Sequence, residues 1–409
     1  MDILITPKKL AGRVTPPSSK SMAHRVILAA ALSEGESRVE NLSFSKDIEA
    51  TLGCVGQLGC SWSQPDPETV VIRGQRGRGD SRGEIPLFDC GESGSTLRFL
   101  IPIALAVRGG GRFTGQGRLM ERPQKPYFDI FDEKGISYSQ EGGVLAVRGN
   151  LSSGEYRLPG DVSSQFVTGL LYALPLLKGD SEIILTSPLE SAGYVDMTLQ
   201  SLSGFGIRVE QRYGRYRVPG GQSYTPRIVA VEGDWSQAGF WYAAKALGNR
   251  VEIAGLDEKT AQGDRVVKEH FSRLRGEGDV EIDLADCPDL LPPLAVMAAV
   301  RRDATRFTGA ARLRLKESDR LATVCALLTA LGCPAEEGPD SLAVHGQGSN
   351  GLAGGTVDGA NDHRIVMAAA IAATACKGPV KILGAQAVDK SYPAFWRHFT
   401  ELGGRISVL

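Results

Sequence analysis

The sequence predicts an α/β protein made of six similar units, in which short strands and helices alternate and which form two domains of three units each. Two observations carry this prediction: one motif recurs along the chain, and the hydrophobic periodicity switches between about 2 and about 3.6 within each copy. The length of 409 residues agrees, because it is enough for two large domains at roughly 150 residues or more each.

The recurring motif is a helix-like segment that ends in glycine and is followed by two short strands joined by a turn. Its turn glycines follow one another at intervals of 76, 71, 126 and 71 residues, and the long interval holds one degenerate copy near Gly276. The hairpin in every unit interrupts simple β-α-β alternation, so a doubly wound sheet is disfavoured. The turn glycines are Gly59, Gly135, Gly206, Gly332 and Gly403.

No linker rich in Pro, Gly and Ser separates the two halves of the chain. The loop Pro219–Pro226 is the best candidate for a crossover between domains. The Gly- and Arg-rich stretch Arg73–Gly83 is similar in composition to an RNA-binding tract. It is short and contains no aromatic residue, so a solvated loop between two strands is the better interpretation.

Composition excludes several classes of protein. The chain has 46 Lys and Arg against 47 Asp and Glu, so a net charge of −1 gives no global field toward nucleic acid or membrane. The longest apolar runs, Leu290–Val300 and Ile365–Cys376, are shorter than the about 20 residues of a membrane span. Seven cysteines without a Cys-x-x-Cys pair, and a start without a signal-peptide pattern, indicate a reduced, cytoplasmic protein.

The predicted helices begin with cationic and hydroxyl side chains. In the segment from Pro16 to Leu32, serines can cap the helix, while Lys20 and Arg25 lie near its positive end, where the macrodipole disfavours cations. A bound anion would reverse that penalty, because free N–H groups and a lysine together form a phosphate site. The alternative is a capped helix with a solvated lysine.

The same pattern recurs at other helix starts, and the repetition favours anion binding. The first recurrence lacks the Gly-Lys-Ser/Thr ending of a P-loop, so a nucleotide site is not indicated. A solvated basic helix face remains the alternative for Arg314, Lys316 and Arg320. The recurrences are Asp89–Arg98, Arg118–Pro123, Asp161–Phe166 before a predicted helix over Val167–Leu177, Arg312–Arg320, and Asn361–Arg364 before a predicted helix over Ile365–Thr374.

Carboxylates beside these cations are candidate proton-transfer groups. Glu317 follows Lys316, and Asp289 precedes the run Leu290–Val300, where the alternative is a helix N-cap. Scattered histidines form no metal motif and the aspartates near Asp289 lack an EF-hand loop, so no metal or other cofactor is expected. The residues alone indicate an enzyme for small, multiply anionic substrates, which Lys and Arg neutralise.

Six motifs follow one another along nearly the whole chain: Pro17-Ser-Ser-Lys20-Ser21-x-x-His24-Arg25, Gly91-Glu-Ser-Gly94-Ser-Thr-x-Arg98, Glu121-Arg122-Pro123, Ser163-Ser164-Gln165-Phe166, Leu315-Lys316-Glu317-Ser-Asp-Arg320 and Asp362-His363-Arg364. Together they resemble the EPSP synthase family of enolpyruvyl transferases. The resemblance implies two domains, each of three β-α-β-α-β-β units in an inside-out α/β barrel, with the active site in the interdomain cleft. It also implies two crossovers, so we expect domain 1 to comprise residues 15–226 and domain 2 to comprise residues 1–14 and 227–409.

The resemblance further implies transfer of the enolpyruvyl group of phosphoenolpyruvate to the 5-hydroxyl of shikimate 3-phosphate, with release of phosphate. Domain 1 would bind shikimate 3-phosphate, and domain 2 would carry the catalytic carboxylates and the basic residues for phosphoenolpyruvate. We expect a monomer with these two small molecules as its partners. The implied catalytic residues are Asp289, Glu317, Lys20 and Lys316. The implied shikimate 3-phosphate-binding residues are Lys20, Ser21, Arg25, Ser163, Ser164, Gln165, Ser191, Tyr194, Asp289 and Lys316. The implied phosphoenolpyruvate-binding residues are Lys20, Gly94, Arg122, Gln165, Arg320, Arg364 and Lys390.

Two residues depart from the family pattern. Glu92 stands where the family usually has Asn, and Arg312 where some members have Asn. The extra negative charge of Glu92 is expected to alter the affinity for phosphoenolpyruvate or for the inhibitor glyphosate.

Three other functions compete with this one. The related UDP-N-acetylglucosamine enolpyruvyl transferase typically has a cysteine before Arg-Pro, and the loop Gly115–Pro123 has none. The RNA 3′-phosphate cyclase has related repeats but needs nucleotide-binding features and a basic groove, which a net charge of −1 does not favour. A non-catalytic small-anion-binding protein would not need Asp289 and Glu317 among its cations.

Overall fold

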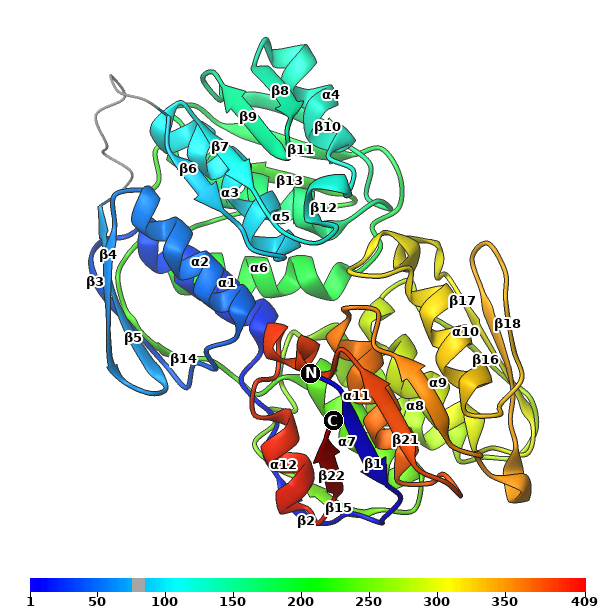
Figure 1. The fold of residues 1–409 in the computed structure, drawn as a ribbon. Helices are drawn as coiled ribbons and strands as arrows, with labels where there is room; N and C mark the ends of the chain where they lie inside the picture. The colour runs from blue at the N-terminus through cyan, green and yellow to red at the C-terminus, as the bar shows by residue number, and fades with distance from the viewer. Residues whose placement is uncertain (76–84) are drawn as a thin grey trace. The chain divides into compact units, whose positions relative to one another are not determined.

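The fold comes from a computed structural model that describes residues 1–75 and 85–409. The chain divides into two compact units: Ser18–Glu232, here called the central unit, and Met1–Pro17 with Gly233–Leu409, here called the terminal unit. Both chain ends belong to the terminal unit, because β1 (Ile3–Thr6) pairs antiparallel with β22 (Arg405–Val408). Figure 1 shows the blue β1 beside the dark red β22.

In the described residues of the central unit, the strands form three four-stranded sheets that follow one plan. An edge strand runs parallel to its neighbour, and the remaining two strands pair antiparallel. The first sheet and its helices are β14 (Ile228–Ala230), β3 (Glu34–Glu40), β5 (Thr69–Gln75), β4 (Ser61–Asp66), α1 (Lys20–Leu32) and α2 (Lys46–Gln57). The second set is β6 (Leu87–Asp89), β7 (Gly110–Thr114), β9 (Val144–Arg148), β8 (Ser137–Glu141), α3 (Gly94–Arg108), η1 (Leu119–Glu121) and α4 (Lys125–Lys134). The third set is β10 (Gly154–Leu158), β11 (Ser181–Leu185), β13 (Arg215–Val218), β12 (Glu210–Arg212), α5 (Ser164–Ala173), η2 (Leu174–Leu176) and α6 (Ala192–Gly204).

The terminal unit repeats the plan twice and carries a shortened third copy. Its shortened copy is β15 (Arg250–Ile253), β2 (Ala11–Val14), α7 (Trp235–Ala246), η3 (Gly263–Val266) and α8 (Val267–Leu274). The next set is β16 (Val280–Asp283), β17 (Ala304–Thr308), β19 (Leu342–His345), β18 (Ala335–Glu337), η4 (Pro288–Leu290), α9 (Leu291–Ala299), η5 (Ala311–Leu315) and α10 (Arg320–Ala330). The last set is β20 (Gly355–Asp358), β21 (Val380–Leu383), β1, β22, η6 (Gly348–Asn350), α11 (His363–Ala373), η7 (Ala385–Lys390) and α12 (Phe395–Glu401).

The predicted α/β fold of repeated units is confirmed, but the prediction of a hairpin in every unit is wrong for one of them. In the described residues, β15 pairs only with β2, in parallel, and forms a two-stranded sheet. The chain leaves β15 through the polar stretch that precedes η3, and after α8 it turns directly into β16 of the next sheet. No segment is left over to form the two antiparallel strands, which accounts for the weak motif near Gly276.

The Pro219–Pro226 loop lies inside the central unit rather than at a crossover. Tyr224 is buried and donates its hydroxyl to the Tyr172 carbonyl. The following strand, β14, then pairs with β3, and the side chain of Asn41 donates to the Val231 carbonyl. These bonds hold the chain to the central unit as far as Glu232.

Apolar helices form the interior of each unit. In the terminal unit, every residue of α9 and α11 is buried, and these two helices pack against α7 and against each other. In the central unit, α3 packs against α5, and α1 packs against α6. Helices that are apolar on all sides are stable only in such surroundings.

The helix starts singled out in the sequence are capped by side chains. Ser19, Ser93, Ser163, Asp319 and Asp362 each accept a hydrogen bond from a backbone N–H group of the first turn. Four of these caps directly precede a residue with a predicted role, and the fifth, Asp362, lies two residues before Arg364. The capping residue therefore fixes where each helix begins, and with it the position of the predicted site residues in the first turn.

The observed helix bounds differ slightly from the expected ones. The helix expected over Val167–Leu177 begins earlier, at Ser164, and ends at Ala173, where Pro175 leads into a 3-10 turn. The helix expected over Ile365–Thr374 begins at His363. Within residues 1–75 and 85–409, no helix is both long and apolar enough to cross a membrane. Residues 76–84 of the Arg73–Gly83 stretch lie outside the described residues.

Candidate active site

The first helix of the central unit presents Lys20 at its start. Its Nζ lies 2.6 Å from Oδ2 of Asp47 in the first turn of α2, and both side chains are largely buried. The carboxylate offsets the unfavourable position of a cation at the positive end of α1. Lys20 is therefore held in place by the protein, and the alternative of a freely solvated lysine is excluded.

Arg25, one turn further along α1, is buried and bonded to neighbouring helices. Its Nη1 donates to the Ser21 carbonyl at 2.6 Å, its Nη2 to the Tyr194 carbonyl at 2.8 Å, and its Nε to Oγ1 of Thr198 at 2.9 Å. Burial lowers the pKa of Arg25 to about 10, against the opposing effect of Tyr172 and Tyr194. Three predicted site residues, Ser21, Arg25 and Tyr194, are thus brought together by one guanidinium.

A second group forms where α3 and α5 begin. Gln165 accepts from Nη1 of Arg98 at 2.9 Å and donates to Oγ of Ser95 at 3.0 Å. Arg98 also donates to the Pro123 carbonyl at 2.9 Å and lies over the ring of Phe166. One buried arginine therefore fixes the side chain of Gln165 and the backbone directly after Arg122.

Gly94 leaves room for the guanidinium of Arg122. A Cβ atom at this position would lie 2.5 Å from Nη1 of Arg122, closer than real Cβ contacts. The guanidinium of Arg122 thus lies directly against the first turn of α3. Two residues predicted to contact the same ligand are neighbours.

Three serines with a predicted role lie at the starts of α5 and α6. Ser163 caps α5, and Ser164 follows it as the first helical residue. Ser191, at the N-cap of α6, has φ of 59° and ψ of 45°, a left-handed conformation that non-glycine residues adopt at a cost of about 1 kcal/mol or more. Two helix starts that carry hydroxyl groups suit a phosphate.

The terminal unit holds a cluster of cations and carboxylates around Arg320, which is buried in the first turn of α10. Arg320 contacts three acids: Nη1 lies 2.7 Å from Oδ1 of Asp289, Nη2 lies 2.8 Å from Oε2 of Glu317, and Nε lies 2.8 Å from Oδ2 of Asp362. Burial disfavours its charged form, but these carboxylates outweigh burial and raise the pKa of Arg320. Arg320 is the centre of this cluster, which we call the Arg320 cluster.

Asp289 lies among three cations of this cluster. Besides Arg320, its carboxylate contacts Nη2 of Arg364 at 2.9 Å and Nζ of Lys316 at 3.4 Å. The N-cap of α9 is Leu290, so the interpretation of Asp289 as a helix cap is wrong. Burial lowers the pKa of Lys316, while the charge of Asp289 acts in the opposite direction. The Asp289 carboxylate is thus enclosed by three positively charged side chains.

The interpretation of Arg314, Lys316 and Arg320 as a solvated basic helix face is also wrong. Only Arg320 lies in α10, and it is buried. Arg314 pairs with Asp319 at 2.8 Å and also contacts Glu337. Lys390 is buried as well and donates to the Asn361 carbonyl at 2.6 Å, next to the start of α11.

The two departures from the expected pattern occupy defined positions. The Glu92 carboxylate lies against Gly117, where a Cβ atom would be 2.5 Å from Oε2. Arg312 donates from Nη2 to the Ala285 carbonyl at 2.6 Å, in the loop that leads to Asp289.

Comparison with known proteins decides the family. The sequence model of EPSP synthase (3-phosphoshikimate 1-carboxyvinyltransferase) matches residues 4–399. The chain is 42% identical over 421 residues to the 3-phosphoshikimate 1-carboxyvinyltransferase of Clostridium perfringens (strain ATCC 13124), covering 98% of both chains. It is also 42% identical over 422 residues to that of Clostridium kluyveri, covering 99% of this chain and 98% of the relative. The chain belongs to the EPSP synthase family.

A solved structure shows the same fold. The EPSP synthase from Acinetobacter baumannii matches with a TM-score of 0.82 over 100% of both chains, at 24% sequence identity. The resemblance that the six motifs indicated is therefore confirmed along the whole chain. The Gly115–Pro123 loop lacks the cysteine that is typical of the related UDP-N-acetylglucosamine enolpyruvyl transferase.

Sequence reasoning missed the residues that orient the site. Arg98 and Asp362 belong to the six motifs, but the sequence predicts no role for them, and it gives no signal for Asp47. The structure shows that Arg98 holds Gln165, Asp362 holds Arg320, and Asp47 holds Lys20. A charged residue inside an otherwise apolar helix, as Arg98 is in α3, was the available signal.

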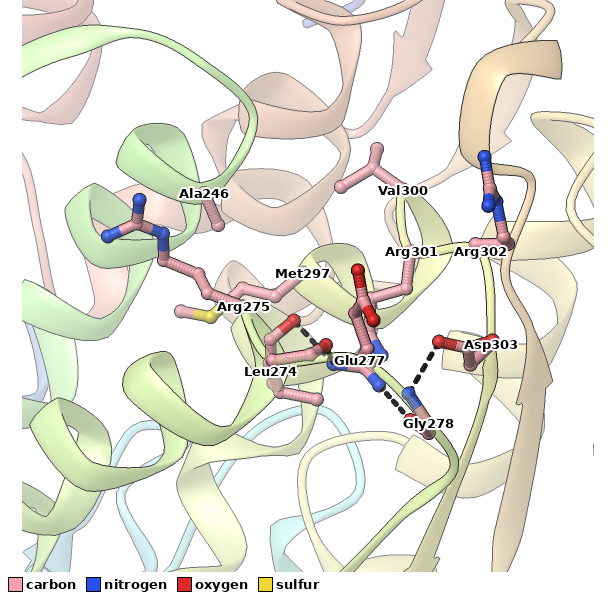
Figure 2. A pocket seen from close by; sticks show the side chains of 11 residues that line it. Ala246, Leu274, Arg275, Glu277, Gly278, Met297, Val300, Arg301, Arg302 and Asp303 are labelled. Atoms are coloured by element: carbon pink, nitrogen blue, oxygen red, sulfur yellow. Dashed lines mark hydrogen bonds between the residues drawn. The ribbon is translucent and has the colours of Figure 1, made fainter.

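A pocket of about 620 Å³ in the terminal unit lies away from all these residues. It is formed by the loop after α8 and the end of α9, and none of the predicted site residues lines it (Figure 2). Arg301 uses its guanidinium there to bind the carbonyls of Leu274, Gly276 and Gly278. Its donors support the loop backbone. No group of three or more His, Cys, Asp and Glu side chains in residues 1–75 and 85–409 is placed to hold a metal ion.

Proposed function

We propose that this protein transfers the enolpyruvyl group of phosphoenolpyruvate to the 5-hydroxyl of shikimate 3-phosphate, giving 5-enolpyruvylshikimate 3-phosphate and phosphate. The observation that carries the proposal is the Arg320 cluster, in which the Asp289 carboxylate lies 3.4 Å from Lys316 and closer still to Arg320 and Arg364. A base surrounded by cations suits a reaction in which a hydroxyl loses a proton and a phosphate group departs.

In the central unit, we assign shikimate 3-phosphate to the starts of α1, α5 and α6. The hydroxyl groups of Ser163, Ser164 and Ser191 would accept the 3-phosphate at two helix starts. Ser21 and Arg25 would face the ring and its carboxylate, and Tyr194 would line the phosphate pocket. The bonds of Arg25 to Ser21 and Tyr194 support one shared surface for these groups.

The cations that we assign to phosphoenolpyruvate occur in each unit. In the central unit these are Lys20 and Arg122, with Gly94 as the surface against which Arg122 lies. In the terminal unit they are Arg320, Arg364 and Lys390. Gln165 would lie between the two ligands, since Arg98 and Ser95 fix both ends of its amide.

The proposed chemistry is an addition followed by an elimination. Glu317, with Lys20, gives a proton to the methylene carbon of phosphoenolpyruvate, and the 5-hydroxyl oxygen adds to the neighbouring carbon as Asp289 takes the hydroxyl proton. In the second step, the C–O bond to phosphate breaks, the methyl group loses a proton back to the protein, and the double bond forms again. Lys316 orients the hydroxyl, and the cations stabilise the departing phosphate.

The decisive test measures phosphate release from phosphoenolpyruvate with shikimate 3-phosphate as acceptor, beside a parallel reaction with UDP-N-acetylglucosamine. We expect release only with shikimate 3-phosphate, and its loss in Asp289→Asn. Release only with the sugar nucleotide would assign the chain to the alternative transferase. Binding of both ligands without any release would leave a non-catalytic anion-binding protein.

We also propose that the protein works as a monomer in the cytoplasm. All seven cysteines are free thiols in the structure, in agreement with a reducing compartment. Sedimentation velocity at several protein concentrations tests the oligomeric state, and a mass that doubles with concentration would contradict it.

A further inference from the structure

His24 is a buried residue of α1 that the proposed mechanism does not use. It lies between Lys20 and Arg25 in the first motif, and its side chain is 1% exposed. Its Nδ1 lies 2.7 Å from Oγ1 of Thr51 in α2. Its Nε2 is buried and has no hydrogen-bond partner among the described residues. Leaving a ring nitrogen in this state costs free energy, so the position calls for an explanation.

From Thr51 a chain of hydroxyl groups continues to the start of α3. Oγ1 of Thr51 lies 2.7 Å from Oγ1 of Thr96, which donates to Oγ of Ser93 at 2.7 Å. Ser93 is the N-cap of α3 and stands between Glu92 and Gly94. The chain therefore joins α1, α2 and the turn against which Arg122 lies.

The direction of these bonds fixes the tautomer of His24. Each hydroxyl has one hydrogen, and that of Thr96 is used on Ser93, so Thr51 must donate to Thr96. If Thr51 instead donated to the Asp47 carbonyl, 3.2 Å away, its hydrogen would still be unavailable to His24. In both cases Nδ1 of His24 carries the hydrogen, and Nε2 is left with a lone pair rather than an unbonded N–H group.

The surroundings keep this ring neutral. Burial lowers the pKa of His24 well below its ordinary value, and the charges of Lys20 and Arg25 on α1 act in the same direction. On α2, the Asp47 carboxylate is paired with Lys20. With a neutral ring, each group in the series donates to the next: His24 to Thr51, Thr51 to Thr96, and Thr96 to Ser93.

We propose that His24 is a positioning residue, which through Thr51, Thr96 and Ser93 holds the Glu92–Gly94 turn in place for phosphoenolpyruvate. The inference rests on the proposed function, because it takes Gly94 and Arg122 to bind that substrate. His24 reaches the turn only through the hydroxyl chain and touches no reacting atom. Its loss should therefore weaken phosphoenolpyruvate binding more than shikimate 3-phosphate binding.

The first test is independent of activity. Nitrogen-15 NMR of histidine-labelled protein reports which ring nitrogen carries the hydrogen, and His24→Leu assigns the signal. We expect the Nδ1–H tautomer, unchanged between pH 5 and pH 8. A signal that titrates in this range, or an Nε2–H tautomer, would overturn the hydrogen-bond chain.

The second test separates positioning from general packing. His24→Leu should raise the KM for phosphoenolpyruvate at least tenfold and change the KM for shikimate 3-phosphate by less than twofold. His24→Asn, whose amide is able to donate to Thr51, should stay within threefold of wild type. Thr51→Val should add little to His24→Leu, because both break the same chain.

Tyr172→Phe is the matched control, because the Tyr172 hydroxyl is buried and donates to the backbone of the same helix at Arg25, away from the turn. We expect lower thermal stability with an unchanged KM for phosphoenolpyruvate. Equal changes in both KM values for His24→Leu, or no rescue by Asn, would reduce His24 to a packing residue. If wild-type protein releases no phosphate, the proposed function fails, while the NMR result still decides on the hydrogen-bond chain.

Discussion

Replacing Arg320 by methionine tests the electrostatic account of the Arg320 cluster most directly. Methionine keeps the apolar stem of the side chain but leaves Asp289, Glu317 and Asp362 without their shared guanidinium. Removing one partner of a buried ion pair costs about 3–5 kcal/mol. Asp289 keeps Arg364, and Asp362 keeps the Ser318 hydroxyl and the Arg364 backbone N–H, so we expect the lower end, about 3 kcal/mol near pH 8.

The stability difference between wild type and Arg320→Met should depend on pH. Burial favours the neutral form of Asp362, but the charge of Arg320 outweighs burial and lowers the pKa of Asp362 below its ordinary value of 3.8. In wild type this carboxylate therefore adds stability above that value, and the contribution disappears as the pH falls through the lowered pKa. Without Arg320, burial and the charge of Glu317 favour the neutral form of Asp362, and we expect them to outweigh its remaining hydrogen bonds and raise its pKa, so the variant loses stability as the pH rises. The difference between the two proteins should shrink from pH 8 to pH 5.

Urea unfolding followed by tryptophan fluorescence measures this difference. Trp235, Trp241 and Trp396 belong to the terminal unit, and a Trp62→Phe background removes the one tryptophan of the central unit. Arg320→Lys serves as the control, because it keeps the charge and loses the three-way contact. A difference below about 1 kcal/mol, or one that stays constant between pH 5 and pH 8, would refute the reasoning.

Three further predictions concern ligand binding and turnover. Asp289→Asn should lower kcat by about 10²–10⁴ and leave the KM for phosphoenolpyruvate unchanged or lower, as steady-state kinetics will show; near-wild-type turnover would contradict its role as the base. Gly94→Ala should raise the KM for phosphoenolpyruvate about 10- to 100-fold, because its Cβ would lie 2.5 Å from the Arg122 guanidinium and push it away from the substrate. The hydrogen bond that Arg122 would then lose to phosphoenolpyruvate involves charged groups and is worth about 1.5–3 kcal/mol. Glu92→Asn should lower the KM for phosphoenolpyruvate or the inhibition constant of glyphosate by about two- to fivefold, the size of a screened charge interaction; two unchanged constants would dismiss a role for Glu92.

Local signals in the sequence were sufficient for the helix starts. Ser163 followed by an apolar run predicts a capped helix, and the structure has that cap and a helix from Ser164. The end of the same helix is predicted less accurately. The α-helix ends at Ala173, and Pro175 lies in a 3-10 turn that follows it. Capping depends on neighbours in sequence and is therefore visible there.

Contacts between distant segments were not predictable in the same way. Asp47 lies 27 residues from Lys20, and Gln165 lies 67 residues from Arg98. Nothing in the local pattern says which acid meets which cation, because that depends on how α1, α2, α3 and α5 pack. The missing hairpin beside β15 was not predictable for the same reason. The parallel partner of β15 is β2, which comes from residues 11–14 near the start of the chain.

The pairing of cations with internal acids explains how a chain of net charge −1 is able to gather so many cations at helix starts. Lys20 is neutralised by Asp47, and Arg320 and Arg364 are neutralised by Asp289 and its neighbours. These three cations are therefore stable without ligand, and an arriving anion must compete with a carboxylate that is already in place. A ligand with one charge gains little from such an exchange. A ligand with several charges gains at several cations at once, so the internal acids favour multiply charged substrates over single anions.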